Sequence, residues 1–218
     1  MKTPQGSLFP ENPLPEEFAS SFAGELDWRA RLETSRRVGL GFAAPGGEFS
    51  KALFEAVVGG VADLKEDLRG ERVVEMGAGM TSYGYALAAF CGAKNYLAVE
   101  PFYTDVLRGS ISEMIQERAG ALPRIPFKVV AKDMLAYLKE EEDDLVSIVA
   151  CGIEDCILAD EGYKRMVEAE IVRVLRPDGA FISSHSDVDP KGLHVTEQWF
   201  RRLANPTVKD RIRIYRKS

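Results

Sequence analysis

The sequence predicts an α/β fold in which helices cover both faces of a mostly parallel sheet, with an antiparallel strand at its C-terminal edge. After Gly70, short apolar runs alternate with segments of helical length, which is the pattern of consecutive strand–helix units. Near the C-terminus, Ile212 and Ile214 alternate with arginines, as in a strand that buries one face. The sequence is therefore expected to form a single sheet.

The chain before residue 50 differs in character from the rest. Four prolines and no hydrophobic period indicate an extended arm over residues 1–24, and a helix over 25–38 is weakly patterned. We divide the chain into an N-terminal arm and helical lid, residues 1–49, and a main domain, residues 50–218. Aromatic side chains in the first part are candidates for covering a substrate or the hydrophobic core: Phe18, Phe22, Trp28, Phe42 and Phe49.

The main domain is expected to begin with a helix capped by Ser50. Its apolar stripe continues to about Leu68, and we expect Gly59 and Gly60 to weaken it without ending it. Later helices are predicted over residues 82–91, 103–119, 133–141, 159–175 and 194–204. Strands are predicted over residues 71–76, 94–99, 127–131, 145–150, 180–184 and 211–216.

Charge and cysteine content narrow the class of protein. The net charge is −6, although residues 201–218 hold seven Lys/Arg against one Asp, and an acidic protein is a poor nucleic-acid binder. We interpret the basic tail as a strand with arginines in solvent rather than an RNA-binding patch. No signal peptide or apolar span is present, so we expect a cytoplasmic protein. Three cysteines and two histidines predict neither a disulfide nor a metal site.

A glycine turn follows the first predicted strand. Gly77 allows a tight turn and Gly79 lets the backbone approach a ligand, while the helix that begins near Ser82 presents unpaired N–H groups. Glu100 ends the second strand, 21 residues after Gly79, where an acidic side chain can accept hydrogen bonds from both hydroxyls of a ribose. These features predict a nucleoside-containing cofactor on a Rossmann-like three-layer sandwich.

NAD and S-adenosylmethionine (SAM) both fit such a site. A dinucleotide fingerprint requires a third glycine where this sequence has Ser82, which weakens NAD without excluding it. Residues 50–216 resemble the class I SAM-dependent methyltransferases in five motifs that occur in the family's order. The segments that carry the resemblance are 73–79, 97–100, 132–134, 144–149 and 174–179.

The resemblance implies SAM as the cofactor and assigns residues to it by position. These are Glu75, Gly77, Ala78, Gly79, Glu100, Pro101, Asp133, Met134 and Cys151. The glycines would line methionine and ribose, Glu100 would hold the ribose, and the residues at 133 and 134 would flank the adenine. Glu75 would reach the amino group through water.

Simpler roles stay open for three of these residues. Glu75 is an equally good cap of the glycine turn, Asp133 is a helix N-cap that can also serve the adenine, and Cys151 is a packing residue, a pocket wall or, less favoured, a nucleophile. We expect Glu100 to face solvent. The sequence departs from the family in having Thr81 at the place of a third glycine, and only one convincing strand after the last helix where the family has an antiparallel pair.

The acceptor is expected beyond the fourth strand, at residues 150–155. This segment lacks the Asn/Asp-Pro-Pro-Tyr/Phe sequence of nucleic-acid base methylases. Glu154, Asp155 and His185 are the candidate bases. We therefore expect methyl transfer to an oxygen or nitrogen of a small molecule. Methylation of RNA or protein and SAM binding without catalysis remain alternatives, and the sequence does not predict an oligomeric state.

Overall fold

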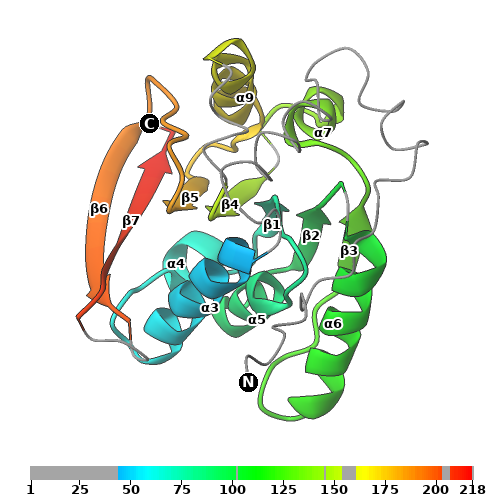
Figure 1. Ribbon diagram of the computed structural model, residues 1–218. Coiled ribbons are helices and arrows are strands. Elements are labelled where there is room, and N and C mark those ends of the chain that lie inside the picture. Colours follow the sequence, from blue (N-terminus) through cyan, green and yellow to red (C-terminus); the bar gives the residue numbers. More distant parts are fainter. Residues whose placement is uncertain (1–43, 102, 145, 154–160, 203–206, 218) are drawn as a thin grey trace, which may run out of the picture.

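The computed structural model describes residues 44–101, 103–144, 146–153, 161–202 and 207–217. They form a seven-stranded sheet with the strand order β3-β2-β1-β4-β5-β7-β6 (Figure 1). Neighbouring strands are parallel from β3 to β5, and β7 is antiparallel to both β5 and β6. The strands are β1 (Arg72–Met76), β2 (Asn95–Val99), β3 (Phe127–Val130), β4 (Ser147–Cys151), β5 (Ala180–Ser184), β6 (His194–Arg201) and β7 (Lys209–Arg216). The predicted α/β class is confirmed.

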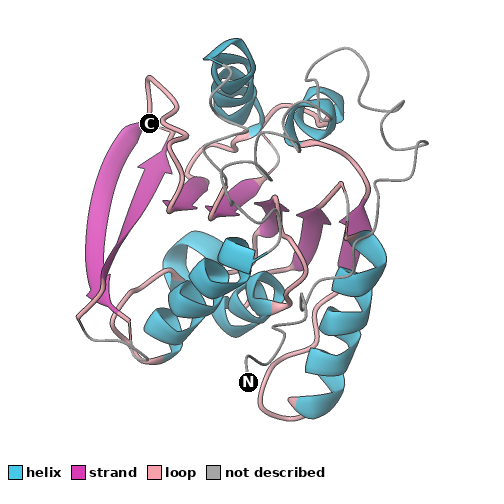
Figure 2. Ribbon diagram, viewed as in Figure 1, coloured by secondary structure: helices cyan, strands magenta, loops and turns pink. Residues whose placement is uncertain are grey.

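Helices lie on both faces of the sheet (Figure 2). One face carries α3 (Ala44–Val58), α4 (Lys65–Leu68), α5 (Tyr83–Cys91) and α6 (Thr104–Glu117), and the other carries α7 (Met134–Glu140) and α9 (Glu161–Val174). Successive residues of β1 point to opposite faces, so Val73 packs in the first core and Val74 in the second. This three-layer arrangement was predicted from the alternation of strands and helices.

The start of the main domain differs from the prediction in two ways. Helix α3 begins at Ala44, so Ser50 lies inside it and does not cap it. The helix ends at Val58, and Gly60 follows with φ +69°, because two adjacent glycines favour the left-handed backbone that terminates a helix. The short helix α4 is therefore separate.

The helix predicted over 194–204 is wrong, because His194–Arg201 forms strand β6. An edge strand pairs on one side only, and here Phe200 is its one buried side chain. The period-two signal of a half-buried strand is consequently absent, although Val195, Thr196 and Trp199 are residues that favour strands. With β6 present, the chain has an antiparallel pair of strands, β6 and β7, of which the sequence predicted only one.

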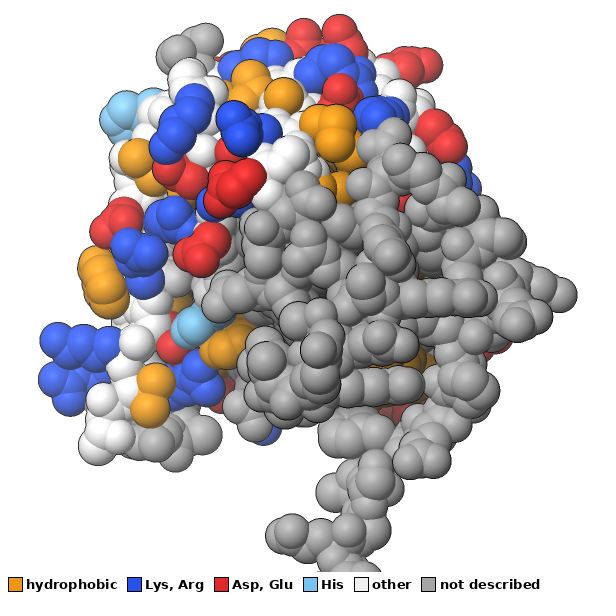
Figure 3. All heavy atoms as spheres, turned by 45° about the horizontal axis from the view of Figure 1, so that its top comes forward, with side chains coloured by type: hydrophobic (Ala, Val, Ile, Leu, Met, Phe, Trp, Pro, Cys, Tyr) orange, Lys and Arg blue, Asp and Glu red, His pale blue; other side chains and the backbone are white. Residues whose placement is uncertain are grey.

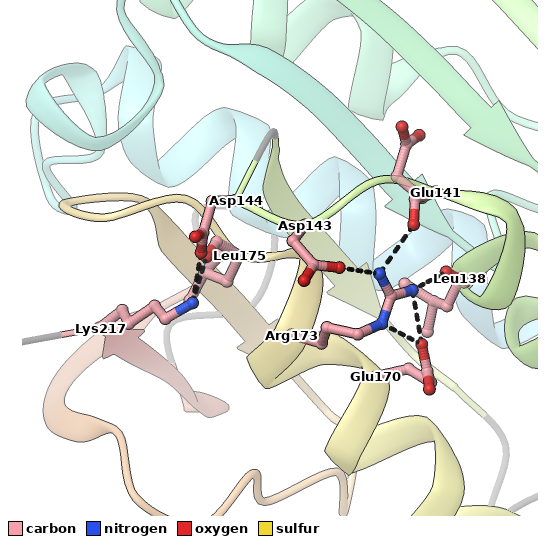
Figure 4. Close-up of polar contacts among 8 residues, drawn as sticks. All are labelled: Leu138, Glu141, Asp143, Asp144, Glu170, Arg173, Leu175 and Lys217. Carbon is pink, nitrogen blue, oxygen red and sulfur yellow. Dashed lines mark hydrogen bonds and ion pairs between the residues drawn. The ribbon is translucent and has the colours of Figure 1, made fainter.

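Strand β7 lies inside the sheet, and β6 forms the edge. Ile212 and Ile214 are fully buried, as the alternation predicts. Much of the positive charge on residues 201–218 is paired. Four basic side chains there contact carboxylates: Arg202 with Asp210, Arg211 with Glu197, Arg216 with Asp67, and Lys217 with Asp144. Figure 4 shows the last of these pairs.

A second charged contact fixes the edge of the sheet at which β4 begins. The Arg173 guanidinium at the end of α9 donates to the carbonyl oxygens of Leu138 and Glu141 at 2.6 and 2.9 Å, and it also contacts Asp143 and Glu170 (Figure 4). The loop between α7 and β4 is thereby held to α9. No helix in the described ranges is both long and apolar enough to cross a bilayer.

Candidate functional site

The glycine turn lies at the carboxyl edge of the parallel strands. Gly77 and Gly79 both have positive φ, +63° and +65°, a backbone conformation that glycine adopts without strain. The Gly77 N–H donates to the Val99 carbonyl at 3.0 Å, and the Gly79 N–H donates to Glu100 Oε2 at 2.8 Å. The turn after β1 is thus tied to the end of β2, where the sequence placed the two halves of a nucleoside site.

Three observations around Gly79 indicate room for a ligand. Among the described residues, no heavy atom lies within 4 Å of a Cβ added there, so these residues leave space beside the turn. Close by, the Thr81 hydroxyl is buried and has no hydrogen-bond partner in the described part of the chain, and such a group is expected to have one. The N-cap of α5, Ser82, makes no capping bond. A ligand with polar groups would satisfy these atoms.

Glu100 does not face solvent as expected; it is only 4% exposed. Its carboxylate accepts from the Gly79 N–H and, at 3.3 Å, from the Tyr103 N–H. The backbone of the glycine turn approaches the strand end closely enough to bury the side chain. Glu100 therefore has a structural contact with the turn as well as a position suited to a ribose.

Glu75 is buried below the turn, between β1 and the helices α3 and α5. Ser50 donates to its Oε1 at 3.3 Å, and the Tyr96 hydroxyl donates to its Oε2. Burial raises the pKa of Glu75 to about 7, although both hydrogen bonds act in the opposite direction. None of these contacts caps the glycine turn. Glu75 therefore does not serve as the cap of the turn considered above, and its hydrogen bonds lie inside the core.

Gly84 on α5 packs directly against this carboxyl group, since a Cβ there would lie 1.8 Å from Glu75 Oε2. We expect Gly84→Ala to lower the free energy of unfolding by about 1–3 kcal/mol, because the buried carboxyl would have to move. Gly109→Ala on α6 is the matched control: in the described part of the chain nothing lies within 4 Å of a Cβ added there, and a gain of about 0.4–1 kcal/mol is expected. Urea denaturation of both variants measures the difference; equal effects would contradict it.

The predicted adenine segment lies at the start of α7. Asp133 caps this helix, accepting from the Ala136 N–H at 3.0 Å, and the Tyr163 hydroxyl donates to the same carboxylate oxygen at 3.2 Å. Met134 is buried in the core under α7 and α9. The N-cap role of Asp133 is confirmed, and an adenine contact stays a prediction.

Three further predicted residues lie at the same edge and are buried: Ala78, Pro101 and Cys151. Burial raises the pKa of the Cys151 thiol well above its ordinary value, and Glu75 adds to the effect. A thiol that stays protonated is a poor nucleophile. Cys151 packs in the hydrophobic core, and a contact with a cofactor stays a prediction. Glu154 and Asp155 lie outside the described residues, as do the predicted arm, the helix over 25–38, Phe18, Phe22, Trp28 and Phe42.

His185 follows β5 and has a partner that the sequence prediction missed. Its Nε2 lies 2.7 Å from Oδ1 of Asp210, which is 1% exposed, and its Nδ1 lies 3.0 Å from the Ser184 hydroxyl. Phe49 stacks on the imidazole with ring centroids 3.8 Å apart. A signal for Asp210 existed, because it has the same parity as Ile212 in the alternating strand and so points inward.

Comparison with known proteins adds the fold. No family model and no curated protein sequence matches the chain, but many solved structures do. The PH0226 protein from Pyrococcus horikoshii OT3 has a TM-score of 0.53 at 14% identity, covering 85% of this chain and 99% of that one. Spermidine synthase from Thermotoga maritima has a TM-score of 0.52 at 12% identity, covering 77% of this chain and 59% of that one. A TehB-like SAM-dependent methyltransferase from Corynebacterium glutamicum has a TM-score of 0.48 at 16% identity, covering 88% of this chain and 97% of that one.

The comparison agrees with the strand order of the chain, which is a mostly parallel sheet that ends in an antiparallel pair. The chain has a Rossmann-like α/β fold. This fold places the glycine turn, Glu100 and His185 along the carboxyl edge of its sheet, where α/β proteins bind ligands. The chain spans 59% and 61% of the two spermidine synthase chains that it matches. At such low identities the likeness concerns the fold alone.

Proposed function

We propose that this chain binds SAM and transfers its methyl group to an oxygen or nitrogen of a small molecule. The observation that carries the proposal is the glycine turn, in which no described residue would meet a Cβ at Gly79 while the Gly79 N–H donates to Glu100. The unpartnered Thr81 hydroxyl fits a ligand beside the turn. Gly77, Gly79 and Glu100 would hold methionine and ribose, and Asp133 and Met134 would flank the adenine.

SAM would supply a methyl group on a positively charged sulfur, so the protein contributes chiefly by positioning. Holding two reactants about 3–3.5 Å apart in line accounts for much of the acceleration of such a displacement. The turn is rigid, since backbone bonds tie it to β2, and Glu75 packs beneath it against Gly84. A non-catalytic SAM-binding protein would need the same turn, so turnover of an acceptor separates the two alternatives.

The paired charges of the C-terminal segment, residues 201–218, support a small acceptor over RNA. Four of its basic side chains already contact carboxylates, and a phosphate backbone would have to displace them. Figure 3 shows Lys/Arg and Asp/Glu side chains interspersed on the described part of one face. Such a surface lacks the extended basic stripe that nucleic-acid binding uses.

Calorimetry with the purified chain tests the cofactor. We expect SAM and S-adenosylhomocysteine to bind at micromolar concentrations and NADH not to bind, because the third glycine of a dinucleotide site is absent. Binding of NADH without SAM would overturn the proposal. A steep salt dependence of RNA binding would instead favour the nucleic-acid alternative.

A further inference from the structure

We propose that His185 removes the proton of the methyl acceptor at its Nδ1, with Asp210 as its positioning residue, and that the acceptor is therefore a hydroxyl group. The inference rests on the proposed function and names the substrate class for the same site. It starts from three contacts of one imidazole, made by Asp210 on β7, Ser184 on β5 and Phe49 on α3.

The contact with Asp210 determines which nitrogen is basic. A carboxylate only accepts hydrogen bonds, so Nε2 of a neutral His185 must carry the proton that Asp210 accepts at 2.7 Å. Nδ1 is left with its lone pair, and the Ser184 hydroxyl, 3.0 Å away, donates to it. The nitrogen is thus already placed to accept from an O–H group. In the proposed step a substrate hydroxyl takes the place of the Ser184 hydroxyl at Nδ1.

Asp210 is itself held in place. Its Oδ1 accepts from His185, and its Oδ2 accepts from Arg202 Nε at 2.6 Å, so neither oxygen is free to turn. Phe49 covers the imidazole face with only 19° between the rings. Contacts from β5, β7 and α3 therefore fix the plane and the tautomer of His185, as a base oriented by a second group requires.

The charges around the ring favour the neutral base. Burial lowers the pKa of His185; Asp210 opposes this effect, and Arg202 and Arg211 add to it. The imidazole is consequently neutral near pH 7 and can take a proton. Once protonated, it forms an ion pair with Asp210 that stabilises the charge.

The proposed step balances. The acceptor oxygen forms a bond to the methyl carbon while the bond from that carbon to sulfur breaks, and the electron pair of the broken bond stays on sulfur. The hydroxyl proton passes to Nδ1, which gives an imidazolium that later releases it to water. A carboxylate acceptor is already ionised at neutral pH and needs no base. An ammonium group would need a base as well, but Nδ1 is already placed to accept from the hydroxyl of Ser184, and this geometry favours an alcohol or a phenol.

Methyl transfer to defined acceptors tests the inference. Release of S-adenosylhomocysteine from SAM would be measured with a panel of alcohols, phenols, amines and carboxylates. We expect turnover of hydroxyl compounds, a fall of about 100-fold or more in kcat for His185→Gln, and an unchanged KM for SAM. His194→Gln is the control, because the second histidine of the chain is exposed on β6.

Asp210→Asn separates positioning from a merely structural role. Because Asp210 raises the pKa of His185, its loss should move the acidic limb of the pH–rate profile to lower pH and reduce kcat about tenfold or more. Asp210→Glu, which keeps the carboxylate, should move the limb back. Thermal unfolding verifies that each variant is folded.

Nitrogen NMR of labelled histidine gives a second readout that needs no acceptor. With two histidines in the chain, His194→Gln assigns the His185 signals, and we expect the proton on Nε2. A proton on Nδ1, turnover by His185→Gln at the parent rate, or methylation of amines or carboxylates only would each overturn the inference, as would SAM binding with no hydroxyl acceptor methylated. Failure of the parent chain to bind SAM would contradict the proposed function instead.

Discussion

Between pH 4.5 and pH 7, ionisation of Glu75 is expected to lower the free energy of unfolding of the parent chain by about 3 kcal/mol. Glu75→Gln should abolish this decrease, because the amide does not ionise. The pKa of Glu75 is raised from 4.5 to about 7 in the folded state. In this pH range the folded chain therefore binds more protons than the unfolded chain. The stability that protonated Glu75 contributes is fully present below pH 4.5 and is lost as the pH rises through 7. The loss is about 1.4 kcal/mol for each unit by which the pKa is raised.

Urea denaturation of the parent and Glu75→Gln at pH 4.5 and pH 8 measures this effect. Other titrating groups contribute equally to both proteins, so their difference in unfolding free energy should shift by about 3 kcal/mol in favour of the variant at pH 8. Glu113→Gln, at an exposed position on α6, controls for the chemical change. Parallel pH profiles for the parent and Glu75→Gln would mean that the buried carboxyl ionises as readily as a free one.

Glu100→Ala should weaken SAM binding by about 10- to 100-fold. Hydrogen bonds to a charged acceptor contribute about 1.5–3 kcal/mol each and add only in part, and each tenfold of affinity corresponds to about 1.4 kcal/mol. The variant should also unfold at a lower temperature, because the Gly79 N–H loses the oxygen that accepts from it at 2.8 Å.

Glu100→Gln separates these two effects. The amide keeps an oxygen for the Gly79 N–H but loses the negative charge, so it should unfold closer to the parent than Glu100→Ala does and still bind SAM weakly. Calorimetry and thermal unfolding of both variants provide the comparison. Parent-like affinity in a folded Glu100→Gln would show that the carboxylate serves only the turn.

The sequence predicted the elements whose burial is regular. Strands β1, β2, β4 and β5 are covered on both faces, so their apolar runs are continuous, and the glycine turn is marked by the backbone conformation that Gly77 and Gly79 supply. Strand β6 was missed because an edge strand with one buried side chain, Phe200, has little periodicity. A period in the sequence reflects which side chains are buried, and few side chains of β6 are buried.

The side-chain partners of the site could not be predicted in the same way. Glu75 and Tyr96 lie on different strands, and the register that joins them arises from the pairing of β1 with β2. Asp210 and His185 are 25 residues apart in the sequence and meet only because β7 is inserted beside β5. The glycine turn and Glu100 were predicted together because a known motif relates them; His185 and Asp210 had no such motif.

The insertion of β7 beside β5 has a consequence for how the chain folds. Strand β6 contacts the sheet only through β7, so a ribosome must deliver both strands before the open edge of β5 is closed, and until then that edge is a site for misassociation. The glycine turn depends on β1 and β2, which pair at a sequence separation of 23 residues (Arg72 with Asn95), whereas β5 and β7 pair at 28 to 36 residues (Ser184 with Ile212, Ala180 with Arg216), and pairing at the smaller separation closes a shorter loop. We therefore expect the strands that hold the glycine turn to be structured before the hairpin docks and brings Asp210 to His185, so that a nascent chain forms the proposed cofactor site earlier than the proposed base.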